Sequence, residues 1–422
     1  MKRLWLMVFA LAALLALRAL ASQDRPKAPL DEWILDIRQG GGRPTRLAVA
    51  DFDPATPEAR EIASELTAVL RDDLEFASIF VLADGAQGAD VLIAGRVSTL
   101  GESLLAEVRF RDLIAKREAF ATEYRAPSGE ARRLAHRIAD DVLAKAGVLG
   151  VAQTQIAFSS RRGSEPRKTI GRMDYDGARQ RQIGAGFLEL GPRWSPDGGS
   201  ILYLSYPRRG AFPMLALATG GLAPQALFES EKMVFPGSWS PDGAKIAFSS
   251  SKDGNPEIYV MDRDGGRLQR ITDHAGIDVS PTWSPTGREI AFTSDRSGSP
   301  QIYVMDAEGL NLTRISLVGS YNAEPAWSPS TDFSEIAYAS RVGGGIFDIV
   351  VHDLLSRHIR QITGQHGLNE SPSWAPNGRH LVFASTRTGD SQIFTVNRDG
   401  SNIHQLTFEG QNATPSWGPA PR

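Results

Sequence analysis

Residues 194–198 read Trp-Ser-Pro-Asp-Gly, and residues 239–243 repeat the same five residues. This phrase predicts a tight turn, because proline fixes the backbone φ angle and the aspartate and glycine suit the turn positions that follow. Proline also has no N–H to donate to a neighbouring strand, so a strand that reaches the tryptophan ends there. The phrase therefore marks strand ends, and its repetition indicates a repeated structural unit.

Weaker copies of the phrase start at Trp283, Trp327, Trp374 and Trp417, and the six tryptophans are 45, 44, 44, 47 and 43 residues apart. Each of the first five turns leads into a short run in which residues alternate between two faces, as they do in a strand. The runs are ILYLS (201–205), IAFSS (246–250), IAFTS (290–294), IAYAS (336–340) and LVFAS (381–385), and a sixth, IAFSS (156–160), has no tryptophan before it.

Each unit contains two further strand-like runs, such as EIYVMD (257–262) and RIT (270–272). A period of 40–50 residues with four short strands is the signature of a β-propeller blade. The run at Ile156 lacks a preceding tryptophan and Trp417 lacks a following run, so a closed ring results if the strand around Trp417 pairs beside Ile156. We therefore predict a mainly β fold, with a six-bladed propeller of four-stranded blades over residues 155–422, closed by its C-terminal strand.

We predict a small α/β domain over residues 22–147, before the propeller, and a linker over residues 148–154. One helix is expected to start at Thr56-Pro57, since proline suits the first helical position, and a second is expected to be capped by Ser128 and to end at Gly147. The expected strands are residues 46–52, 78–82, 89–97, 104–110 and 117–124.

The N-terminus has the pattern of a secretory signal peptide over residues 1–21. Lys2 and Arg3 precede 14 apolar residues (4–17), and residues 19–21 read Ala-Leu-Ala, a small-residue cleavage pattern. Fourteen apolar residues fall short of the roughly 20 that span a bilayer, so direct membrane insertion is not expected. The chain has no cysteine, which excludes disulfides, a thiol nucleophile and acylation of a cysteine.

Composition and motifs predict a binding protein without catalytic chemistry. The 46 Lys and Arg residues nearly balance the 49 Asp and Glu residues, so no basic face for nucleic acid is expected. The chain contains no Gly-x-Ser-x-Gly, zincin or phosphate-loop motif, and its seven histidines lack ligand spacing. The Asp-x-Asp-Gly runs at 174–177 and 262–265 are predicted as hairpin turns. We therefore expect no enzyme activity, no catalytic residues, no cofactor and no metal.

The sequence resembles the TolB family over nearly the whole chain after the signal peptide. The resemblance lies in the WSPDG-xx-IAFxS and IYVMDxDG phrases and, more specifically, in Ile34-Leu35-Asp36, Gly42-Arg43-Pro44 and the AVADF strand (48–52). It implies a non-enzymatic, periplasmic and monomeric scaffold of the Tol-Pal envelope system, which acts in outer-membrane integrity and in constriction during cell division. It further implies binding of the peptidoglycan-associated lipoprotein Pal at one mouth of the propeller, and of the inner-membrane protein TolA through the N-terminal segment. Residues 22–30 form a leader before that segment.

The predicted partner sites follow from this organisation. The connections from one blade to the next should converge on one mouth of the channel, where apolar side chains beside polar ones favour a covered surface. Met233 and Phe235 could instead pack between blades. The predicted mouth residues are Met233, Val234, Phe235, Asp278, Val279, Ala323, Glu324, Asn369 and Glu370, and the N-terminal segment is Trp33, Ile34, Leu35, Asp36 and Ile37.

Two alternatives remain open at this stage. A propeller can bind a small ligand or a glycan in its channel, and propellers with similar phrases accompany the hydrolase domain of some peptidases. A hydrolase domain needs upwards of roughly 200 residues, whereas about 120 lie outside the propeller here. Assays of peptide and glycan binding would separate the first alternative from the scaffold hypothesis.

Overall fold

A computed structural model describes residues 44–420 except 164–165, 221–222, 344 and 365. The predicted signal peptide and the predicted segment from Trp33 to Ile37 therefore lie outside the described residues. The chain divides into two compact units, one up to Gly150 and one from Val151 onward. Among the described residues, none of the helices is long and apolar enough to cross a membrane.

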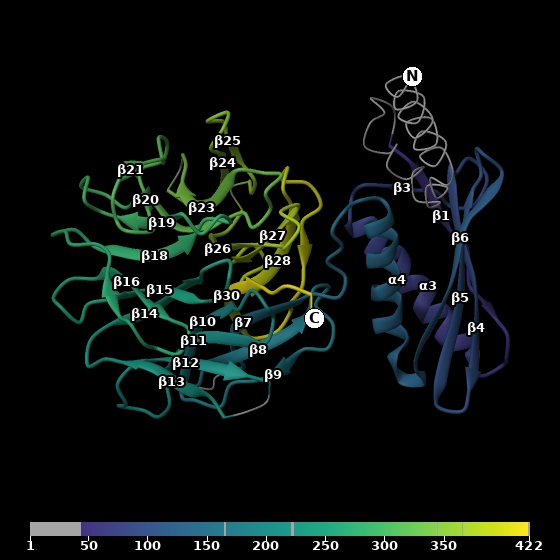
Figure 1. Cartoon of the computed structure of the whole chain (residues 1–422), viewed down its shortest axis with the longest axis horizontal. Coiled ribbons are helices and arrows are strands. Elements are labelled where there is room, and N and C mark those ends of the chain that lie inside the picture. Colours follow the sequence, from purple (N-terminus) through teal and green to yellow (C-terminus); the bar gives the residue numbers. More distant parts are fainter. Residues whose placement is uncertain (1–43, 164–165, 221–222, 344, 365, 421–422) are drawn as a thin grey trace, which may run out of the picture. The chain divides into compact units, whose positions relative to one another are not determined.

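The N-terminal unit is a mixed sheet with two helices on one of its faces (Figure 1). The sheet has the order β3-β1-β4-β5-β6, with β2 beside β4; β1 pairs parallel with β3 and β4, and β4, β5 and β6 are antiparallel. The elements are β1 (Arg46–Val49), β2 (Asp53–Pro54), α3 (Ala59–Phe76), β3 (Val81–Leu82), β4 (Val91–Leu100), β5 (Ser103–Asp112), β6 (Arg117–Pro127), η1 (Ser128–Glu130) and α4 (Ala131–Lys145).

Ser128 does not cap the second helix, contrary to the prediction. Residues Ser128–Glu130 form a short 3-10 turn, and α4 begins at Ala131 after Glu130, without a side-chain cap. The leucine, isoleucine and valine stripe of α4 is buried as its helical spacing predicts, at Leu134, Ile138 and Val142. The spacing of the apolar residues therefore predicted the helix correctly, whereas the Ser128 hydroxyl does not mark its first residue.

The second unit consists of six four-stranded antiparallel sheets, numbered here as blades 1 to 6. From the inner to the outer strand, blade 1 contains β30 (Gln411–Trp417), β7 (Gln155–Arg161), β8 (Thr169–Asp174) and β9 (Arg181–Gln182), and blade 2 contains β10 (Leu188–Trp194), β11 (Ser200–Tyr206), β12 (Met214–Thr219) and β13 (Gln225–Glu229). In the same order, blade 3 contains β14 (Val234–Trp239), β15 (Lys245–Ser250), β16 (Glu257–Asp262) and β17 (Gln269–Arg270), and blade 4 contains β18 (Asp278–Trp283), β19 (Glu289–Ser294), β20 (Gln301–Asp306) and β21 (Thr313–Arg314). Blade 5 contains β22 (Asn322–Trp327), β23 (Glu335–Arg341), β24 (Phe347–Asp353) and β25 (Ile359–Gln361), and blade 6 contains β26 (Asn369–Trp374), β27 (His380–Ser385), β28 (Gln392–Asn397) and β29 (His404–Gln405).

The ring closes as the sequence predicts. The C-terminal strand β30 lies beside β7 and pairs with it in antiparallel (Figure 1). In this pairing Trp417 lies opposite Ile156. Each of the six inner strands ends at a tryptophan of the repeated phrase. The fold class is therefore confirmed, as a six-bladed propeller preceded by an α/β unit.

The repeated phrase makes a turn and also joins neighbouring blades. In the first copy the Ser195 hydroxyl donates to Asp197 Oδ1 at 2.5 Å, and Gly198 has a φ of 70°, which glycine adopts without strain. The backbone N–H of Trp283 donates to the Ser238 hydroxyl of blade 3 at 2.9 Å, and that of Trp417 donates to the Ser373 hydroxyl of blade 6 at 3.1 Å. In four blades the hydroxyl of the residue before the tryptophan thus holds a tryptophan N–H of the neighbouring blade.

Candidate functional site

One end of the propeller carries a ring of exposed apolar side chains. The four strands of each blade are antiparallel, so each outer strand finishes at this side of the propeller. The inner strand of the next blade starts at the same side. We call it the connection rim, and we call the opposite end, with the tryptophan turns, the turn rim. Among the described residues, the large apolar side chains exposed at the connection rim are Phe212, Met233, Phe235, Ile277, Leu317, Val318, Ile346, Leu368 and Phe408.

Some of the residues predicted at the mouth do face solvent on this rim. Met233 is 48% exposed and Phe235 is 40% exposed. Glu370 is exposed as well, and Val279, Ala323 and Glu324 are partly exposed. The exposure of Met233 and Phe235 argues against the alternative that they merely fill space between blades.

Three predicted mouth residues are buried, and the structure corrects their assignment. Val234 lies in the apolar core shared by blades 2 and 3, Asp278 pairs with Arg296 at 2.6 Å, and Asn369 is fully enclosed. Each is the first residue of an inner strand, where the side chain points between two blades. These residues support the rim from below, and their side chains do not face a partner.

Other exposed rim residues were missed by the sequence reasoning. Phe408 is 74% exposed and Leu317 is 68% exposed, and both lie in connections between blades. Phe212 is 60% exposed and lies in the link between β11 and β12, which also reaches this rim. A large apolar residue inside an otherwise polar loop was the available signal for all three.

A repeated hydrogen bond anchors the connections beneath the rim. In three connections an asparagine at the start of the inner strand donates its Nδ2 to a side chain at the start of the preceding blade's third strand. A Ser or Thr hydroxyl of the outer strand region donates to that same acceptor. The asparagine pairs are Asn322 with Gln301 at 2.8 Å, Asn369 with Asp348 at 2.9 Å and Asn412 with Gln392 at 2.9 Å, and the hydroxyls are Ser316, Thr363 and Thr407.

Blade 4 departs from this pattern, because two acids meet there. Asp278 occupies the asparagine position and Glu257 the acceptor position, and the buried Asp278 Oδ1 has no hydrogen-bond partner among the residues that the structure describes. Burial raises the pKa of Asp278, and the charge of Glu257 raises it further, whereas Ser294 and Arg296 act to lower it. Burial also acts to raise the pKa of Glu257, but hydrogen bonds from Thr272, the His274 backbone and Arg270 outweigh it and lower that pKa.

The inner strands enclose a channel with a cavity of about 470 Å³. Its walls are mostly tryptophan, proline, serine and threonine, and Arg193 and Glu324 are the two charged residues among the described residues that line it. Arg193 lies on β10 of blade 2 and Glu324 on β22 of blade 5, which face each other across a ring of six.

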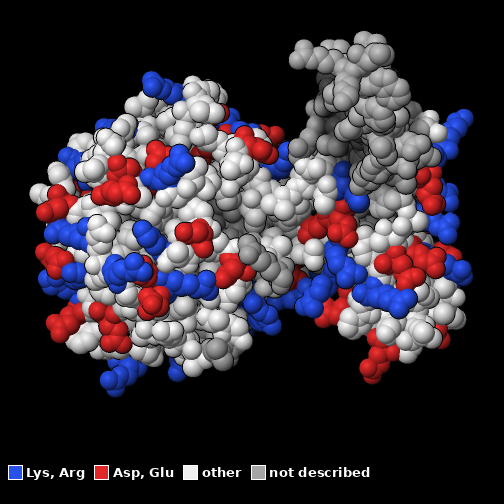
Figure 2. Space-filling model, viewed as in Figure 1, with Lys and Arg blue, Asp and Glu red and all other residues white. Residues whose placement is uncertain are grey.

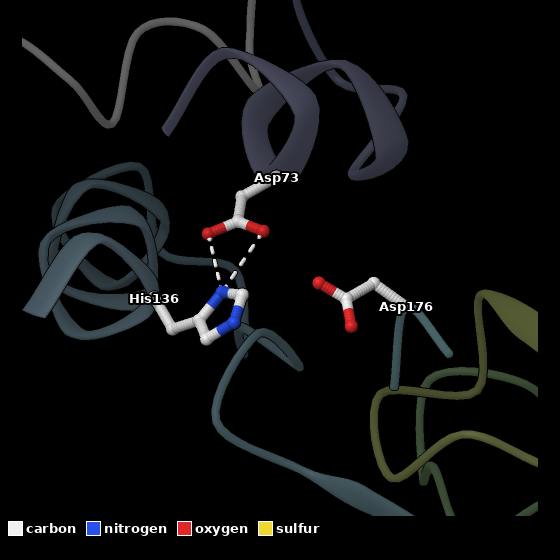
Figure 3. A group of neighbouring side chains, drawn as sticks. All are labelled: Asp73, His136 and Asp176. Atoms are coloured by element: carbon white, nitrogen blue, oxygen red, sulfur yellow. Dashed lines mark hydrogen bonds and ion pairs between the residues drawn. The ribbon is translucent and has the colours of Figure 1, made fainter. Parts of the chain in front are cut away.

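The N-terminal unit contains a buried histidine and carboxylate pair. His136 Nδ1 of α4 lies 2.8 and 3.1 Å from the two carboxylate oxygens of Asp73 of α3 (Figure 3). Both side chains are at most 3% exposed. The pair therefore fixes the packing of one helix on the other. Asp176, also drawn there, belongs to the propeller unit.

Acidic and basic side chains are interspersed over the face of the chain seen in Figure 2. Several of the opposite charges form ion pairs, such as Arg263 with Asp197 at 2.9 Å and Arg267 with Asp262 at 2.6 Å. Exposed pairs of this kind contribute little to stability and do not mark a site. Among the described residues, large exposed apolar side chains are more numerous at the connection rim, with nine, than at the turn rim, which has Leu268, Leu310, Leu312, Leu355 and Ile403.

Comparisons with known proteins agree with this architecture. A family model described as the TolB beta propeller domain matches residues 144–421. The Tol-Pal system protein TolB of Anaeromyxobacter dehalogenans (strain 2CP-C) is 35% identical over 300 residues, which cover 65% of this chain and 66% of that protein. The protein of the same name from Gluconobacter oxydans (strain 621H) is 31% identical over 279 residues, covering 62% of this chain and 59% of that protein.

The alignments thus span slightly less than two thirds of these relatives' length. The crystal structure of TolB from Acinetobacter baumannii superposes with a TM-score of 0.78 and 24% sequence identity, covering 90% of this chain and 97% of that chain. At this identity the superposition establishes the shared fold.

Proposed function

The chain belongs to the TolB family of β-propeller proteins, and from this premise we propose that it is a non-enzymatic, periplasmic protein of the Tol-Pal envelope system. In this role it binds Pal at the connection rim and TolA through its N-terminal segment, and it serves outer-membrane integrity and constriction during division. The supporting observation is the ring of exposed apolar side chains on one rim of a rigid scaffold. Such a ring on a rigid scaffold is expected where a partner covers it.

The proposed Pal surface is tested by placing charge on the rim without touching the core. Met233→Asp combined with Ile277→Asp should weaken Pal binding at least tenfold, about 1.4 kcal/mol, because two carboxylates would be desolvated in an apolar contact. Both side chains are nearly half exposed, at 48% and 45%, so the thermal unfolding temperature should stay close to that of the wild type. Binding is measured by isothermal titration calorimetry with purified Pal.

The matched control places the same change on the turn rim. Leu310 and Leu355 are 65% and 84% exposed there, and Leu310→Asp with Leu355→Asp should leave Pal binding unchanged. If the turn-rim pair weakens binding and the connection-rim pair does not, the partner uses the opposite end of the propeller. Val234 is unsuitable for this test because it is only 1% exposed and its replacement by Asp would unfold the core.

The N-terminal role has a separate test. Deleting residues 22–42 of the mature chain should abolish TolA binding, because residues 33–37 combine an amphipathic strand pattern with a following glycine-rich turn and can add as a strand to a partner. Pal binding should survive. Deleting residues 22–30 alone separates the leader from the segment, and TolA binding should then persist. TolA binding that survives the longer deletion would exclude this segment as the contact.

A further inference from the structure

The two charges in the channel both depart from the repeat. The residue before the tryptophan is Ser238, Thr282, Ser373 and Ser416 in four blades, and each accepts a hydrogen bond from a tryptophan N–H of a neighbouring blade. Blade 2 has Arg193 at this position. An arginine cannot accept such a bond, and neither can Ala326 of blade 5. Arg193 joins the blades differently, because its Nε donates to the Gly237 carbonyl of blade 3, and this bond uses only one side of the guanidinium.

The guanidinium of Arg193 is held against the channel wall. Its Nε donates to the Gly237 carbonyl at 2.9 Å and its Nη1 donates to the Pro192 carbonyl at 2.9 Å. These neutral partners fix the plane of the group, and within the described part of the chain they leave Nη2 available as a donor. Burial lowers the pKa of Arg193, and only the distant Glu324 opposes this effect. The guanidinium is therefore held in a fixed orientation, and its positive charge has little negative charge close to it.

Glu324 is held in a similar way on the opposite blade. Its backbone has a φ of 56° in the left-handed region, and its Oε2 accepts from the Ser371 backbone N–H at 2.7 Å and from the Ser371 hydroxyl at 3.1 Å. Its Oε1 accepts no hydrogen bond among the described residues. Burial and the charge of Glu324 raise the pKa of neighbouring Glu370, so this side of the channel is electronegative.

Arg193 and Glu324, both within the described part of the chain, form no ion pair with each other, although the charge of Glu324 acts to raise the pKa of Arg193. An anion alone would be attracted by Arg193 and repelled by Glu324, and a cation alone would meet the reverse. From this geometry we propose that the channel binds a small zwitterion of the amino-acid or short-peptide class. Its carboxylate pairs with Arg193 and its ammonium pairs with Glu324. The cavity of about 470 Å³ fits such a ligand. This inference goes beyond the proposed partner binding and does not require it.

Six tryptophans line the cavity, so their fluorescence reports occupancy. The purified protein is titrated with glycine, diglycine and triglycine, which differ in the separation of their charges, and with N-acetylglycine and glycinamide, which each retain one charge. We expect at least one of the three zwitterions to saturate, and each single-charge analogue to bind at least tenfold more weakly. Isothermal titration calorimetry checks the affinity independently.

Two variants assign the ends of the ligand. Arg193→Gln should weaken the best zwitterion at least tenfold, and Glu324→Gln should do the same while strengthening N-acetylglycine, because a repulsive carboxylate is removed. Strengthening of a single-charge ligand is a response that a purely structural role would not produce. Arg181→Gln and Glu231→Gln remove exposed charges outside the channel and serve as matched controls.

Circular dichroism establishes that each variant is folded, and if Arg193→Gln fails to fold, the Glu324→Gln response alone decides. The proposal is overturned if no zwitterion binds more tightly than the single-charge analogues. It is also overturned if the folded Glu324→Gln variant binds every ligand as the wild type does. Loss of Pal binding in the connection-rim variants would leave this result unaffected, so the two proposals fail independently.

Discussion

Deletion of residues 411–422 is expected to open the ring and to abolish cooperative unfolding of the propeller. The deletion removes β30, whose register with β7 runs from Gln411 opposite Arg161 to Trp417 opposite Ile156. Trp417 also donates its Nε1 to Thr154 Oγ1 at 2.7 Å. Loss of a buried tryptophan alone costs about 3–5 kcal/mol, which is comparable to the stability of many whole proteins. The remaining chain would expose the unpaired edge of β7 and the face of blade 6 against which β30 packs.

The truncated protein should aggregate and should show a broad, non-cooperative transition in urea and in calorimetry. Deletion of residues 420–422 is the matched control, because it leaves β30 and the Gly418 N–H bond to the Gln155 carbonyl at 2.8 Å in place. Light scattering on both proteins gives the association state. A monomeric 411–422 deletion with an unchanged melting temperature would contradict closure by this strand.

The strands and the closure of the propeller could be predicted from local sequence, since proline and glycine turns and alternating residues act over a few positions. The orientation of the rim residues could not. Both faces of a blade pack against neighbouring blades, so alternation does not tell which side chains reach solvent. For this reason Val234 and Asn369, at the starts of inner strands, were expected at the surface and are buried.

The channel charges were only half visible in the sequence. Glu324 was predicted as a mouth residue because it lies in a connection between blades, whereas Arg193, directly before the repeated phrase, was not singled out. Only the ring brings blades 2 and 5 face to face, through residues 131 positions apart (324 − 193). The buried acids Asp278 and Glu257 likewise meet only because consecutive blades pack together.

Asp278→Asn is expected to stabilise the protein. In blade 6 the equivalent Asn369 accepts from Arg387 Nη2 at 2.9 Å while donating to Asp348, so an asparagine can use both neighbours. An asparagine at position 278 would keep the contact with Arg296, and its amide would donate a hydrogen bond to Glu257. We expect the free energy of unfolding to rise by about 1–2 kcal/mol, because two buried acceptors that now face each other would be joined by a hydrogen bond.

The gain from Asp278→Asn should depend on pH. The folded pKa of Asp278 is raised above its unfolded value by burial and by Glu257. Its contribution to the free energy of unfolding is therefore fully present below the unfolded pKa and is lost as the pH rises through the folded pKa. Arg296 on Asp278, with Arg270 and Asp273 around Glu257, completes the charged groups of this cluster. The difference between variant and wild type should widen from about pH 4 to pH 8 in urea unfolding.

The reciprocal change, Asn369→Asp, should reproduce the acid pair where the wild type has none. A carboxylate at 369 would face Asp348 Oδ1, to which Asn369 now donates at 2.9 Å, and Ser385 and Arg387 would remain on its other oxygen. Burying a second carboxylate beside the first costs about 3 kcal/mol once it ionises, because Arg387 on its other oxygen offsets only part of the repulsion and desolvation. The loss should be small near pH 4 and largest near pH 8, because the new carboxyl is expected to hold its proton until its raised pKa is passed. Asn322→Asp, which faces the neutral Gln301, is the control and should lose less than Asn369→Asp at high pH. Equal losses in the two variants at all pH values would show that the meeting of two acids does not govern this connection.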